Sequence, residues 1–375
     1  MLRLLLVVGI LGLWQQTAAA QATQPGDDAA KLYLQAEKLL RDNDNANIWS
    51  PSASNFVYAE YPPYPAEWQR TEKKDFLANA AARALAHQAR SIEHANWPKL
   101  LPPPNPGVSY LNECRNLSNE LADAAIYQHL QGNDAAAIET LRDQWHLADL
   151  LEDQSEKKLV CLLVSIGIRA QICQRFEIIT SNVVLTKDPG DGKALQTSVA
   201  RELIGQLLMH PDAKTEVNDV LRAYGSQVGL IAKPTIDRCI ETDNRVNAER
   251  GMAAMSIACH LYRFDTGNWP KSLDDLRGYL SDVPIDPWGD GTQTLGYALI
   301  KGGLPDGSDR PLVYSRCGMK DGLFFRNDEP AYSFYTGAGS HRPGREQKQG
   351  GQFRDVASWA PTEGSHPAAA TQPLE

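Results

Sequence analysis

Motifs that would assign a reaction fail in this sequence at identifiable positions. Residues 190–193 come closest to a phosphate-binding loop, but Lys187 stands where that motif needs its first glycine, and Ala194 where it needs the hydroxyl that binds magnesium. Neither the G-x-S-x-G turn of α/β-hydrolases nor the H-E-x-x-H motif of zinc proteases occurs. The S-x-x-K match at 155–158 lacks its companion motifs, so we interpret it as chance.

Histidine and carboxylate pairs offer two weaker kinds of chemistry. His87 and His94 lie seven residues apart and could contribute to a metal site, but no third ligand is in view, so a structural role is expected. Asp149, Glu152 and Asp153 could provide paired carboxylates for acid–base work, yet their pattern is typical of a solvated helix surface. No catalytic residue is therefore predicted.

Composition limits the class of protein to which the chain can belong. The chain has 375 residues, of which 42% are hydrophobic and 22% charged, and this is typical of a globular chain with room for two domains. Its net charge of −9 argues against nucleic acid as a partner, because binding phosphates requires clustered lysine and arginine.

Residues 1–22 are typical of a secretory signal peptide. Arg3 precedes an apolar run over 4–14, and the small residues that follow allow cleavage after Ala20 or Ala22. The run is too short for a transmembrane helix, which needs about 20 apolar residues, and no later segment approaches that length. We expect an exported protein, periplasmic or extracellular, without a membrane span after cleavage.

Residues 27–230 predict an all-helical domain. Helical periodicity predicts a short first helix capped by Asp27 or Asp28, and a hairpin of two helices joined by a tight turn at 131–134. Further helices are expected over 72–95, 159–184, 194–209 and 213–229, and the helix over 159–184 is apolar enough to be central.

An aromatic and proline-rich loop is expected at 43–68, because its prolines forbid a continuous helix. Its tryptophans and tyrosines could stack on a sugar or peptide, although packing against the helices is the commoner use of such rings.

Six cysteines follow the signal peptide, and two states are open to them. An even number in an oxidising compartment permits disulfides, whereas buried free thiols would act as small hydrophobic groups. Cys161 and Cys173 cannot pair with each other if they share one helix, because they would be about 18 Å apart along its axis.

A second region, 236–335, predicts a small α+β module. A long helix is expected over 236–264, and frequent glycines and prolines then separate short runs such as 294–300 and 311–314 that suit strands. Residues 336–375 are poor in apolar side chains and predict a disordered tail. The fold class is therefore mainly α, a helical-hairpin bundle followed by an α+β module.

Four features of this second region occur in an order that resembles a known family. They are an A-x-x-x-Y-x-x-x-x-G-x-x-P helix end at 258–270, a D-P-W-G turn at 286–289, Tyr297, and the run 313–315. Residues 250–322 thereby resemble the C-terminal portion of the type II secretion major pseudopilins. The resemblance implies a long helix packed on a short antiparallel sheet, with Trp288 buried against that helix.

In that family a C-terminal loop binds calcium, and only Asp321 matches the loop here. Residues 324–329 replace the downstream acids of the family, and calcium needs six to eight oxygen ligands. Asp321 is the one metal ligand, for calcium, that the resemblance implies. The chain also lacks the family's basic leader and membrane-inserted helix, so filament assembly is not implied.

These observations favour an exported, non-enzymatic interaction or structural protein whose protein partner or ligand is unknown. The alternative is a secreted enzyme of unrecognised family with its site between the 43–68 loop and the helical domain. Carboxylates or histidines that converge beside Tyr61, Tyr64 or Trp68 would favour the enzyme.

Overall fold

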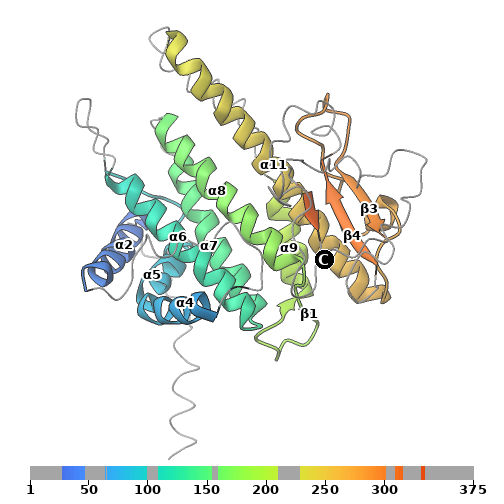
Figure 1. Ribbon diagram of the computed structural model, residues 1–375, viewed down its shortest axis with the longest axis horizontal. Helices are drawn as coiled ribbons and strands as arrows, with labels where there is room; N and C mark the ends of the chain where they lie inside the picture. The colour runs from blue at the N-terminus through green and yellow to red at the C-terminus, as the bar shows by residue number, and fades with distance from the viewer. Residues whose placement is uncertain are drawn as a thin grey trace, which may run out of the picture.

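A computed structural model describes residues 28–46, 64, 66–98, 109–153, 159–209, 229–300, 309–315 and 331–333. Over these ranges the protein is mainly helical, as expected, with eight α-helices, a two-stranded sheet and a three-stranded sheet (Figure 1). The predicted signal peptide at 1–22, the helix at 213–229 and the tail at 336–375 lie outside the described residues.

The first three helices are α2 (Ala29–Asn45), α4 (Ala66–Ala78) and α5 (Ala80–Ala89). The Asp28 side chain caps α2, accepting from the backbone N–H of Ala30 at 3.1 Å. The single helix expected over 72–95 is wrong, since the chain begins a helix at Ala66, breaks it at Asn79 and ends at Ala89. Pro65 precedes α4 and so does not interrupt it.

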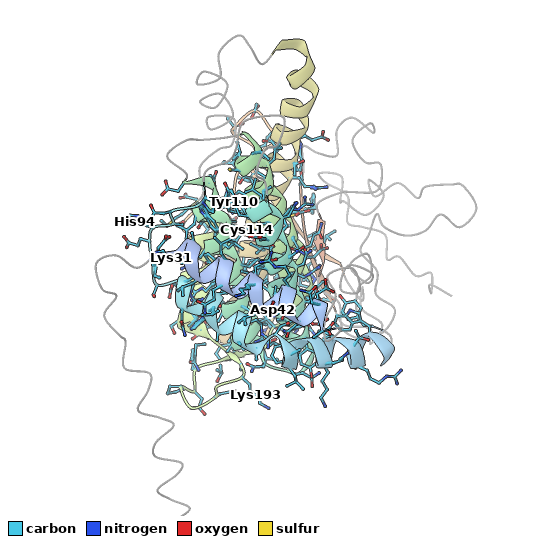
Figure 2. All side chains as sticks on the ribbon, turned by 90° about the vertical axis from the view of Figure 1, so that its left-hand side faces the viewer. Lys31, Asp42, His94, Tyr110, Cys114 and Lys193 are labelled. Atoms are coloured by element: carbon cyan, nitrogen blue, oxygen red, sulfur yellow. The ribbon has the colours of Figure 1, made fainter. Side chains whose placement is uncertain are left out.

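The predicted hairpin is confirmed as α6 (Ser109–Leu130) and α7 (Asp134–Glu152). Gly132 turns the chain with φ 72°, which glycine adopts readily, and Asn133 caps α7 by accepting from Ala136 N–H at 3.2 Å. His129 fastens the turn, with Nδ1 2.5 Å from Asp134. Figure 2 shows α2 lying over α6, which carries Tyr110 and Cys114.

The central helix is α8 (Leu159–Thr180), which packs against α6 and α7. After it, β1 (Leu185–Thr186) pairs in parallel with β2 (Leu195–Gln196), and α9 (Thr197–Leu208) follows. The region 27–230 is therefore not entirely helical. The segment between α8 and α9 contains turn residues that cannot continue a helix, and the pairing of β1 with β2 fixes its two ends side by side.

Helix α11 (Gly229–Thr266) connects the two parts of the fold. It contacts α8 and α9 and also the strands β4 and β5, and Figure 1 shows it running between the helices and the sheet. It begins before the predicted start at 236, since Pro234 lies near the helix N-terminus and removes one hydrogen bond without ending the helix. Gly267, with φ 78°, ends it.

The three-stranded sheet is antiparallel, with β4 (Arg310–Tyr314) between β3 (Gly296–Ile300) and β5 (Ala331–Ser333). The strands expected at 294–300 and 311–314 are confirmed as β3 and β4. Gly296 lies opposite Tyr314, and a Cβ atom at 296 would stand 2.5 Å from that ring. Absence of a side chain there lets the Tyr314 ring cover the strand.

The structure describes four cysteine side chains, all buried and none in a disulfide: Cys114, Cys161, Cys173 and Cys259. The prediction that Cys161 and Cys173 do not pair is confirmed. Cys114, Cys161 and Cys259 fill space in the apolar core, and the Cys173 thiol lies 3.8 Å from the carbonyl oxygen of Val246.

Candidate functional site

The structure describes some of the site residues that the sequence predicted and leaves others outside the described ranges. Asp321, the calcium candidate, and Tyr61 fall outside the described residues. Tyr64 and Trp68 are described and pack against each other in a tilted arrangement, with ring centroids 4.4 Å apart and planes at 44°. Tyr64 is buried and Trp68 packs against the hydrophobic core, so these two rings of the 43–68 segment contribute to packing. Trp68 itself belongs to α4 rather than to a loop.

The inward face of α4 is acidic. Trp68, Glu72, Asp75 and Asn79 are spaced by four, three and four residues and so lie along one side of the helix. Glu72 and Asp75 are each only 4% exposed, and Asn79 is buried as well. Inward faces of amphipathic helices are normally apolar, and Asp and Glu are rarely buried without partners.

A third acid, Glu120 of α6, is fully paired. Its two carboxylate oxygens accept from Arg83 Nη1 at 2.6 Å and from Asn79 Nδ2 at 2.7 Å. Arg83 also donates to the carbonyl of Phe76 and places its guanidinium 3.8 Å from that ring's centroid. Asn43 of α2 donates to Asn79 at 2.7 Å and so fixes the amide that bonds Glu120.

Glu72 and Asp75 differ from Glu120, because neither carboxylate makes a hydrogen bond or ion pair with any residue that the structure describes. Burial raises the pKa of Glu72 to about 8, and repulsion from Glu120 and Asp75 adds to this rise. Attraction to Arg83 and Arg175 opposes it.

The pKa values of the two neighbouring acids, Glu120 and Asp75, are raised as well. Burial raises the pKa of Glu120 to about 7, against the attraction of Arg83. Burial likewise raises the pKa of Asp75 to about 6, against the attraction of the exposed Lys74. Near neutral pH the cluster formed by Glu72, Asp75 and Glu120, here called the α4–α6 acidic cluster, therefore holds both protonated and ionised carboxyl groups.

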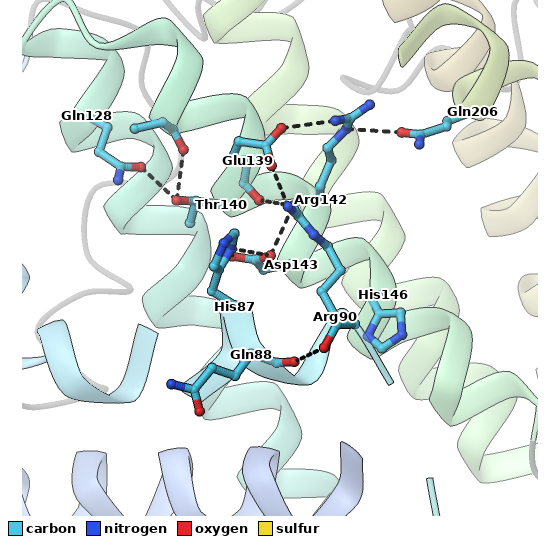
Figure 3. A network of polar contacts seen from close by, with 12 residues as sticks. His87, Gln88, Arg90, Gln128, Glu139, Thr140, Arg142, Asp143, His146 and Gln206 are labelled. Carbon is cyan, nitrogen blue, oxygen red and sulfur yellow. Dashed lines mark hydrogen bonds and ion pairs between the residues drawn. The ribbon is translucent and has the colours of Figure 1, made fainter. Parts of the chain in front are cut away.

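A separate polar network joins α5 to α7 (Figure 3). His87 Nδ1 lies 3.2 Å from both oxygens of Asp143, and Arg90 contacts Asp143 at 3.1 Å and also Glu139. Arg142 extends the network through Glu139 at 3.0 Å. His87 thus contributes to helix packing, as its structural interpretation predicted.

The acids of α7 form only in part the solvated surface that the sequence predicted, because Glu152 is largely buried. Arg169 of α8, only 2% exposed, donates to Asp149 at 2.8 Å and forms an ion pair with Glu152, which is largely buried. Asp153, at the C-cap of α7, is exposed as expected, and the Asp149 side chain keeps 46% of its surface exposed. Arg169 was not singled out in the sequence because the carboxylates that it bonds lie on a different helix, α7.

The D-P-W-G turn is fixed by its first residue. Asp286 is buried, and its carboxylate accepts from the Ser315 hydroxyl at 2.8 Å and from the Trp288 N–H at 3.1 Å. Because Ser315 follows β4, these bonds tie the turn to the sheet. Trp288, which was expected to be buried against the long helix, is partly buried and packs against the hydrophobic core.

Two further findings concern metal ligands and membrane-spanning helices among the described residues. Within it, no group of three or more histidine, cysteine, aspartate or glutamate side chains could hold a metal ion. A search of the same residues finds no helix with the length and apolar character needed to cross a bilayer. The α4–α6 acidic cluster is therefore the strongest candidate site, and the sequence missed it because nothing in α4 marks which face turns inward.

Comparisons of the chain with protein-family models, with curated proteins and with solved structures found no match.

Proposed function

We propose that this chain is an exported, non-enzymatic interaction protein in which a helical part carries a pseudopilin-like α+β module. The observation that carries the proposal is the arrangement of the second region. A long helix ends at Gly267, an antiparallel sheet packs on it, and the Asp286 turn is tied to that sheet through Ser315. This arrangement is what the resemblance of residues 250–322 to the major pseudopilins implies.

The state of the nucleophiles supports a non-enzymatic role. Burial raises the pKa of Cys114, Cys173 and Cys259, and a thiol acts as a nucleophile only when it ionises. Burial also lowers the pKa of His260 to about 3, and its ring packs edge-on against Trp269. These groups stay neutral near pH 7 and serve packing.

Export is tested by the N-terminus of the mature protein. When the full chain is expressed in a bacterium and recovered from the periplasm or medium, its sequence should begin at Gln21 or Thr23. Recovery of uncleaved protein in the cytoplasm alone would overturn this part of the proposal.

The interaction role is tested by capture from the exported fraction with the tagged full chain and two surface variants. Ile285, beside the Asp286 turn, is 49% exposed, and Leu77 on α4 is 66% exposed, so a charge at either should be tolerated. We expect Ile285→Asp to lose the partner and Leu77→Asp to retain it. Capture of nothing beyond the tag control would refute the role, and retention by Ile285→Asp would refute the module as the binding face.

Calcium binding at Asp321 remains part of the proposal and has its own test. Calorimetric titration of the full chain with calcium should release heat that Asp321→Ala abolishes. Absence of heat from the wild-type chain would exclude this ion at millimolar affinity or better.

A second function, acid–base catalysis beside the 43–68 segment, is favoured by one observation. Glu72, with a pKa of about 8, is largely protonated at neutral pH next to an ionised Asp75, and such a pair can divide the roles of acid and base. Turnover of chromogenic hydrolase substrates that Glu72→Gln abolishes and the exposed Glu93→Gln preserves would support it. Equal turnover in both variants would exclude Glu72 as the acid.

A further inference from the structure

We draw no further inference here: the strongest candidate, the exposed side-chain cluster at the C-terminal end of α11 in which Lys187 and Arg201 lie over the rings of Phe264 and Tyr279, already pairs both cations with Asp265, and nothing among the residues that the structure describes shows what would cover it.

Discussion

Glu72→Gln should remove a large part of the pH dependence of folding stability, because the pKa of Glu72 differs greatly between the folded and the unfolded protein. The ordinary pKa of 4.5 applies to the unfolded chain, and burial raises it to about 8 in the folded protein. The folded state therefore holds the proton more tightly. The stability that the protonated Glu72 contributes is complete below pH 4.5 and is lost as the pH rises through 8.

The magnitude follows from the shift. Each pKa unit corresponds to about 1.4 kcal/mol, so the wild-type chain should lose about 4 kcal/mol of unfolding free energy through Glu72 between pH 5 and pH 9. Glutamine has no charge to bury, so the variant should lose only what Glu120 and Asp75 contribute. At pH 9 the variant should be the more stable protein, and at pH 5 the two should be nearly equal.

The assay is urea unfolding followed by far-ultraviolet circular dichroism at several pH values from 5 to 9, in buffers free of amines. Glu93→Gln provides the control, because its carboxylate is exposed and its curve should follow the wild type. Parallel pH profiles for wild type and Glu72→Gln would refute the reasoning, since they would mean that Glu72 is solvated or paired in the folded protein.

Three further predictions concern packing. Arg169→Met should cost about 3 kcal/mol in urea unfolding, because it leaves two α7 carboxylates without their buried cation; an unchanged midpoint would contradict this pairing. Gly251→Ala should lower the stability of the protein by about 2 kcal/mol, since the new Cβ would stand 2.7 Å from Leu295. Gly205→Ala has open space around the new Cβ and should raise the stability by about 1 kcal/mol. Equal shifts of the thermal unfolding midpoint in the two variants would argue against the close approach at Gly251. The four described cysteines should resist Ellman's reagent in the folded protein and react in denaturing urea, as peptide mapping can show.

The hairpin of α6 and α7 could be predicted because its signals are local. Gly132 supplies the positive φ of the turn and Asn133 the cap, and neither depends on the rest of the chain. The ends of β3 and β4 were predictable for a similar reason, since glycines and prolines surround them. The break at Asn79 was not, because that side chain turns away from the helix to bond Glu120 on another element.

The candidate site could not be predicted, because the apolar residues of α4 do not mark one inward face. Leu77 is 66% exposed, whereas Glu72 and Asp75 are buried on the same side of the helix as Trp68. The helix turns this way because Asn79 and Arg83 bond the partner carboxylate Glu120. Such pairing between distant segments leaves no signal in a single sequence. The role of Arg169 was hidden for the same reason.

The position of α11 has a consequence for how the gene can be divided. One contiguous apolar core extends from Tyr33 of α2, through Met252 and Ile257 of α11, to Val313 of β4. A cut between residues 230 and 236 would therefore separate α8 and α9 from α11 and expose their apolar surfaces to water. The face of α11 that packs on α8 and α9 would be exposed as well, because the sheet contacts a different part of that helix's surface. The helical part and the sheet should melt in a single transition, and neither should be transferable to another protein without this helix.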